Sequence, residues 1–160
     1  MMNWCSLAWN VICDAVFEYD GLTAVIDMVR KYRNKYDLIL VKAATSIDSR
    51  FVDELSFQYY VATKCGLEVN KCYIFTINGE YERGRTLNLK ELFDVVDFTP
   101  SILKRAEKIE SEIEFMRNTL SEEEEIEKDV GMHCFQPFAC PYFAHCKKCN
   151  GIPERSDLQI

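Results

Sequence analysis

Four closely spaced cysteines are the strongest sign of chemistry in this sequence. Clustered thiolates of this kind hold Zn²⁺ or an iron–sulfur cluster through four ligands. Their gaps are five, five and two residues, and the four are Cys134, Cys140, Cys146 and Cys149. We expect them to bind a 4Fe–4S cluster or Zn²⁺, with free thiols as the alternative. Two neighbouring histidines are further candidates for zinc, His133 and His145.

A lysine at the end of an apolar run is the second feature. In DLILVKAATS, residues 37–46, a strand period of two places Leu38, Leu40 and Lys42 on one face. A charge directed at a core is costly unless it is paired, so Lys42 needs a partner. Asp27, on the preceding predicted strand, is the expected one. The pair is either a structural salt bridge or part of a site where carboxylates bind Mg²⁺ and a lysine activates water.

Alternating and helical patterns predict the elements that position these residues. Strands are expected over 11–19, 22–30, 36–43 and 69–77, with a hairpin turn at Asp20–Gly21. A helix should start within 46–49, run to about Cys65 and end at Gly66. A long helix should run from Pro100 to about residue 120. The predicted fold is α/β or α+β, with a mixed central sheet of about four strands, a crossover helix, a long C-terminal helix and a Cys-rich cap.

Charge and composition limit the partners. The net charge is −7, but SEEEEIEKDV alone contributes −5 and the rest of the chain only about −2. Charge therefore neither supports nor excludes DNA, but it rules out binding by a strongly basic surface alone. No run approaches the roughly 20 apolar residues that span a bilayer. Without a recognisable export signal, we expect a cytoplasmic protein that does not bind membranes.

The chain resembles a family of nucleases over residues 11 to about 146. The resemblance rests on AVFEYDGLTAVIDMV, YDLILVKAATSIDSRFVDELSFQYYVATKCGLEV, YIFTINGEYERG and GMHCFQPFACPYFAHC. These stretches resemble PD-(D/E)XK nuclease-like domains of the RecB and Cas-four type, with a restriction-endonuclease-like core. More narrowly, they are similar to the form found in a bacterial domain-of-unknown-function family.

The resemblance implies a set of site residues. It matches Asp27 to the metal-binding Asp, Lys42 to the motif lysine and Gln58 to a helix glutamine, with Glu54 one turn earlier on the same helix face. Asn78 and Tyr81 match the family's Asn-x-x-Tyr stretch. An active site of this type would use Mg²⁺ or Mn²⁺. Leu40, however, occupies the position of the motif's second acid, and an apolar side chain cannot ligate a metal.

The resemblance also implies how the chain is divided. Residues 1–120 would form the nuclease-like core, 121–131 an acidic linker, and 132–160 the cap and tail. In Cas-four-type relatives, an N-terminal cysteine joins three C-terminal ones around the cluster. Here Cys134, Cys140 and Cys146 match the three, and the fourth ligand would be Cys149, Cys5 or Cys13. Two other cysteines are expected to be small buried hydrophobes, Cys65 and Cys72.

Two functions remain open from the sequence. The first is a nuclease-like, DNA-processing domain, N-terminally truncated and degenerate at Leu40, whose missing N-terminal segment or downstream domain another chain would supply. The second is a non-catalytic module that binds nucleic acid or protein and is stabilised by the Cys-rich metal cap. The oligomeric state is not predicted.

Overall fold

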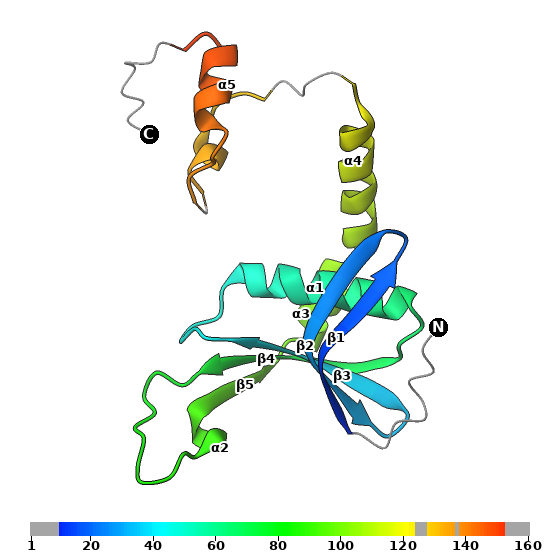
Figure 1. Ribbon diagram of the computed structural model, residues 1–160, viewed down its shortest axis with the longest axis vertical. Helices are drawn as coiled ribbons and strands as arrows, with labels where there is room; N and C mark the ends of the chain where they lie inside the picture. Colours follow the sequence, from blue (N-terminus) through cyan, green and yellow to red (C-terminus); the bar gives the residue numbers. More distant parts are fainter. Residues whose placement is uncertain (1–9, 124–127, 137, 153–160) are drawn as a thin grey trace. The chain divides into compact units, whose positions relative to one another are not determined.

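The computed structural model describes residues 10–123, 128–136 and 138–152. The chain divides into two compact units, Met1–Phe115 and Met116–Ile160. The first unit holds the sheet and its helices (Figure 1). Residues 153–160 of the predicted cap and tail, residues 124–127 of the acidic linker and Cys5 lie outside the described residues. Among the described residues, no helix is long and apolar enough to cross a membrane.

The first unit is an α+β fold around a five-stranded mixed sheet. The strands are β1 (Val11–Tyr19), β2 (Leu22–Tyr32), β3 (Lys35–Lys42), β4 (Val69–Ile77) and β5 (Phe93–Asp97), and they lie side by side in this order. The pairs β1–β2, β2–β3 and β4–β5 are antiparallel, whereas β3–β4 is parallel. The predicted mixed sheet and crossover are therefore confirmed.

The crossover helix α1 (Ser49–Lys64) covers one face of the sheet. Its N-cap is Asp48, whose carboxylate accepts the Arg50 amide at 2.8 Å, and Gly66 follows its end with φ of 88°. The helix contacts β1, β2, β3 and β4, and its buried residues pack against the side chains on one face of the sheet. Leu38 and Leu40 belong to this core and are 0% exposed. Leu38 and Leu40 therefore share the core-facing side of β3, as the strand period predicts for residues 38, 40 and 42.

Two expectations about the second half of the core are wrong. The sheet has a fifth strand, β5, which follows the short helix α2 (Leu89–Leu92). The expected long helix is two helices, α3 (Thr99–Ala106) and α4 (Ile109–Ser121). They separate where the Lys108 amide donates to the Arg105 carbonyl at 3.2 Å, three residues back, instead of continuing the four-residue helical ladder. Helix α3 packs on α1 with Ile102 fully buried, and α4 bonds to α1 where the Glu110 carboxylate accepts the Lys64 ammonium at 2.8 Å.

The second unit contains the end of α4, the short 3-10 turn η2 (Met132–Cys134) and α5 (Phe143–Cys149). The rings of Phe135 and Phe143 pack together with centroids 4.9 Å apart. The cap therefore contains one short helix and an aromatic contact, with few buried residues among those described.

Candidate functional site

Asp27 lies on β2 at the point where its pairing with β3 ends. The paired register of these strands ends at Met28 opposite Ile39. Beyond it, the Asp27 carboxylate accepts the backbone N–H of Val41 at 2.6 Å. Asp14, at the same level of β1, has a positive φ of 49° and interrupts the β1–β2 pairing. The carboxylate thus replaces a strand carbonyl at an irregularity of the sheet, a structural role for this side chain.

Lys42 pairs with the crossover helix and not with Asp27. Its Nζ lies 2.7 Å and 2.9 Å from the two carboxylate oxygens of Glu54, and 5.5 Å from the centre of the Phe51 ring. The expectation that Asp27 is its partner is wrong, because α1 lies over the face to which Lys42 points. The ion pair neutralises both groups at the end of β3.

Gln58 reaches the same face of the sheet one helical turn after Glu54. Its side-chain amide is 5% exposed and donates to the Val25 carbonyl of β2 at 2.9 Å. Its Oε1 is buried and has no hydrogen-bond partner. A buried acceptor left without a donor costs about 1–3 kcal/mol. Of the four predicted site residues, Gln58 is therefore the one with a buried polar atom that lacks a hydrogen-bond partner among the described residues.

The nuclease-type metal site does not fit Mg²⁺ or Mn²⁺ as it is arranged. These ions need several oxygen ligands, including carboxylates. Leu40, which the resemblance matches to the motif's second acid, is 0% exposed within the core. Across the described ranges, no three His, Cys, Asp or Glu side chains converge to hold a metal ion. We therefore assign no hydrolytic step to Asp27, Lys42, Glu54 and Gln58.

The cysteines of the cap lie on separate short segments. Cys134 ends the 3-10 turn and is buried, and its carbonyl accepts the Cys140 amide at 2.8 Å. Cys146 and Cys149 lie on α5, where the Cys149 Sγ is 3.5 Å from Nε2 of His145. No three of these groups converge in the described part of the cap. The described side chains of the cap therefore do not form a four-ligand site in this arrangement, and a 4Fe–4S cluster or Zn²⁺ at the cap stays a prediction.

The remaining cysteines divide between core and surface. Cys72 is 0% exposed on β4, as expected, and burial raises the pKa of its thiol to about 12. Cys65 is exposed at the end of α1, so the expectation that it is buried is wrong. Cys13, the N-terminal alternative for a cluster ligand, is exposed on β1 in the first unit.

A buried aspartate forms a network that the sequence does not reveal. Asp37 is 1% exposed and accepts Arg30 at 2.7 Å and Asn70 at 2.8 Å. The signal in the sequence is an acid at the start of an apolar run, but its two partners lie on β2 and β4. Only the pairing of three strands brings them together.

Asn78 and Tyr81 shape the connection between β4 and β5. The side-chain Nδ2 of Asn78 donates to the Glu91 carbonyl at 3.0 Å, and its Oδ1 accepts the Glu80 backbone N–H at 2.9 Å. The Tyr81 hydroxyl accepts the Asn88 amide at 2.9 Å. The two residues therefore hold the loop that leads to α2 and β5.

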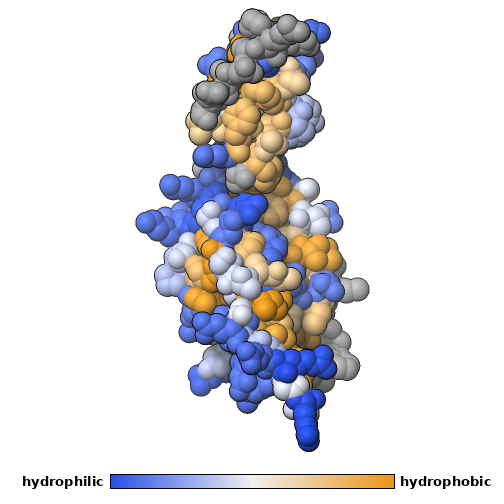
Figure 2. Space-filling view, turned by 90° about the vertical axis from the view of Figure 1, so that its left-hand side faces the viewer, coloured by the Kyte–Doolittle hydropathy of each residue, from blue (hydrophilic) through white to orange (hydrophobic). Residues whose placement is uncertain are grey.

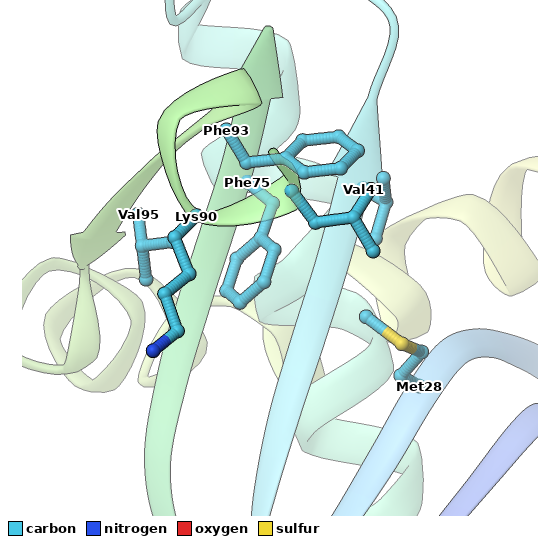
Figure 3. A pocket seen from close by; sticks show the side chains of 7 residues that line it. Met28, Val41, Phe75, Lys90, Phe93 and Val95 are labelled. Atoms are coloured by element: carbon cyan, nitrogen blue, oxygen red, sulfur yellow. The ribbon is translucent and has the colours of Figure 1, made fainter. Parts of the chain in front are cut away.

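A pocket of about 380 Å³ lies on the sheet face opposite α1, beside this loop. Sequence analysis did not predict it, because residues far apart in the chain build it. In Figure 3 the Phe75 ring stands between Met28 on one side and the side chains of Val95 and Lys90 on the other. Val41, Phe93 and Leu89 complete the lining. The volume falls within the range of ligand and side-chain pockets.

The chain matches no protein-family model, and no curated protein matches it.

Proposed function

We propose that this chain is a non-catalytic module, built on a nuclease-like core, that binds another protein. The observation that carries the proposal is the burial of Leu40 at the position of the motif's second acid. A side chain that is part of the core cannot be replaced by a metal ligand without moving the strand. Beside it, Lys42 is held by Glu54 and Asp27 holds a backbone amide.

The charges favour a protein over a nucleic acid. Binding to the phosphate backbone depends on lysine and arginine side chains that are free to replace counterions. Six of these cations form ion pairs with carboxylates of the same chain: Arg30, Lys42, Arg50, Lys64, Lys71 and Arg105. The net charge of −7 adds nothing to this argument, because SEEEEIEKDV alone contributes −5 of it.

Exposed apolar side chains near β5 favour a protein partner. Leu87, Leu89 and Val95 are 52%, 60% and 53% exposed. Figure 2 shows hydrophobic residues set among hydrophilic ones at the surface of the side that it displays. Apolar groups gathered beside a pocket and bordered by charges are typical of interaction sites.

A nuclease-like, DNA-processing role is the second candidate. The orphaned Oε1 of Gln58 favours it, because a bound group could donate to this atom. In this role the cap would have to bring its cysteines together around a 4Fe–4S cluster or Zn²⁺. Iron, zinc and sulfide analysis of anaerobically purified protein tests the cap. Stoichiometric metal that is lost in Cys140→Ser would show that the cap binds metal, which both candidates allow, so the choice between them rests on the DNA assay below.

A cleavage and binding assay separates the two candidates. The protein is incubated with labelled single- and double-stranded DNA in millimolar Mg²⁺ or Mn²⁺, beside the matched variants Lys42→Ala and Asp27→Asn. We expect no cleavage above the level of either variant and no retention of DNA at physiological salt. Cleavage that both substitutions abolish would overturn the non-catalytic proposal. Salt-resistant DNA binding without cleavage would overturn the preference for a protein partner.

A further inference from the structure

The strand β5 is an exposed edge of the sheet. It is the last strand in the order β1-β2-β3-β4-β5, and β4 and α2 are the elements that contact it substantially. Four of its five residues are exposed, including Val95 at 53% and Val96 at 39%. Natural proteins commonly cover or distort such edges, because unpaired N–H and C=O groups there can pair with another chain.

The hydrogen bonds on either side of β5 show which backbone groups are open. The backbone N–H of Phe98 donates to the Cys72 carbonyl at 2.9 Å, and the backbone N–H of Asn78 donates to the Leu92 carbonyl at 2.8 Å. In an antiparallel pair, residues alternate between those bonded to the neighbouring strand and those that are not. Residues 92, 94, 96 and 98 therefore face β4. The N–H and C=O of Val95 consequently point to the open edge.

The pocket lies directly beside these open groups. Phe93 and Val95 alternate along β5, so their side chains share one sheet face, and both line the pocket (Figure 3). A residue paired with Val95 on an added strand would have its side chain on this same face. A long or aromatic side chain there can reach past Val95 to its diagonal neighbours. The edge thus combines backbone bonding groups with a place for one apolar side chain.

We propose that β5 binds an extended peptide segment of a partner protein, which adds a sixth strand and inserts one large apolar side chain into the pocket. This inference rests on the proposed protein-binding function and deepens it. Strand addition gains affinity from main-chain hydrogen bonds and specificity from such side-chain pockets.

The carboxylates of β5 favour a peptide that carries basic residues on both sides of its apolar residue. Asp94 and Asp97 lie near the two ends of β5. Asp97 already binds Lys71 at 2.7 Å, whereas Asp94 forms no ion pair with any described residue. A second copy is a poorer occupant, because β5 paired with β5 would bring four aspartates into one short ladder.

The test is a titration with a synthetic peptide. The probe is labelled Lys-Thr-Val-Thr-Phe-Thr-Val-Thr-Lys, and the matched control peptide has Glu at both ends. Fluorescence anisotropy should show saturable binding of the basic probe to the full chain, with the acidic control at least about fivefold weaker. Absence of saturable binding by the probe at millimolar protein would overturn the proposal.

Two substitutions at one position test the geometry. Val95→Pro removes the outward N–H without removing a bond to β4, a place where an edge strand tolerates proline. Val95→Ala keeps the N–H and trims only the pocket wall. We expect binding to weaken about tenfold or more in Val95→Pro and about two- to threefold in Val95→Ala. Equal affinities for wild type and Val95→Pro would show that the peptide binds elsewhere.

Two further measurements keep the result decisive. If Val95→Pro does not fold, the Val95 amide signal of the wild-type protein in NMR must still shift and gain exchange protection as the probe binds; an unchanged signal contradicts the proposal. Sedimentation of the free wild-type protein should show a monomer. A dimer that Val95→Pro dissociates would mean that β5 pairs with a second copy of the chain, not with a peptide. A failed peptide titration leaves the DNA assays unaffected, so the non-catalytic proposal stands or falls separately.

Discussion

The substitution Leu40→Glu tests whether position 40 belongs to the core or to a site. The side chain is 0% exposed within the cluster that includes Leu38, Leu55 and Ile74. Leu40→Ala should cost about 2–5 kcal/mol of unfolding free energy, from lost burial and the cavity that remains. Glu adds a buried carboxylate, and Lys42, the cation on the same strand face, is already bound to Glu54. We expect its total cost to exceed about 4 kcal/mol at neutral pH.

The assay is urea unfolding followed by circular dichroism. With a denaturant slope of about 2 kcal/mol per M, Leu40→Ala should lower the midpoint by about 1–2.5 M. Leu40→Met is the matched control, expected to cost less than about 1.5 kcal/mol because it conserves volume. Burial raises the pKa of a carboxyl group, so the penalty of Leu40→Glu should shrink as the pH falls and the group becomes neutral. If Leu40→Glu lies within about 1 kcal/mol of wild type at pH 7, the side chain reaches solvent and the argument against a metal site fails.

Three other predictions concern paired and buried groups. A double-mutant cycle of Lys42→Met and Glu54→Gln in urea should give a coupling below about 1 kcal/mol, because both side chains are partly exposed; a coupling above 2 kcal/mol would contradict this. The hydrogen bond from Lys71, followed by those from Thr99, lowers the pKa of Asp97 to about 2. The stabilisation of the folded state by ionised Asp97 should be complete above about pH 4, near the pKa of an unfolded aspartate, and should be lost toward pH 2. In thermal unfolding, Asp97→Asn should therefore lower the stability at pH 7 and have no effect near pH 2. The Cys72 thiol, with its pKa raised to about 12, should resist iodoacetamide at pH 8 in the native protein and react in urea, and mass spectrometry of native protein showing this cysteine alkylated would refute its burial.

The sequence by itself determined the local structure of most of the core. Alternation of apolar residues placed β1, β2, β3 and β4, because each strand buries one face on α1. The Asp20–Gly21 dipeptide marked the hairpin, and both residues have positive φ, of 50° and 74°. The ends of α1 followed from an acceptor side chain before its first turn and a glycine after its last. These signals act over a few residues and survive without knowledge of the fold.

Tertiary structure alone decided the partners of the charged residues. Lys42 binds Glu54, 12 residues away on a helix, and Asp37 meets Arg30 and Asn70 on two other strands. The sequence shows that such charges need partners, but several carboxylates and cations satisfy that need equally well. The choice is made by which element covers which face. That information exists only after the sheet and α1 have packed.

The same reason explains why β5 and its pocket escaped the sequence. FDVVD has five residues and an acid at two of them, so it carries no clear alternation. It becomes a strand by pairing with β4, and the pocket forms because Met28, Val41 and Phe75 come from three other strands. Short edge strands and the surfaces beside them gain their structure from long-range contacts, which no local pattern encodes.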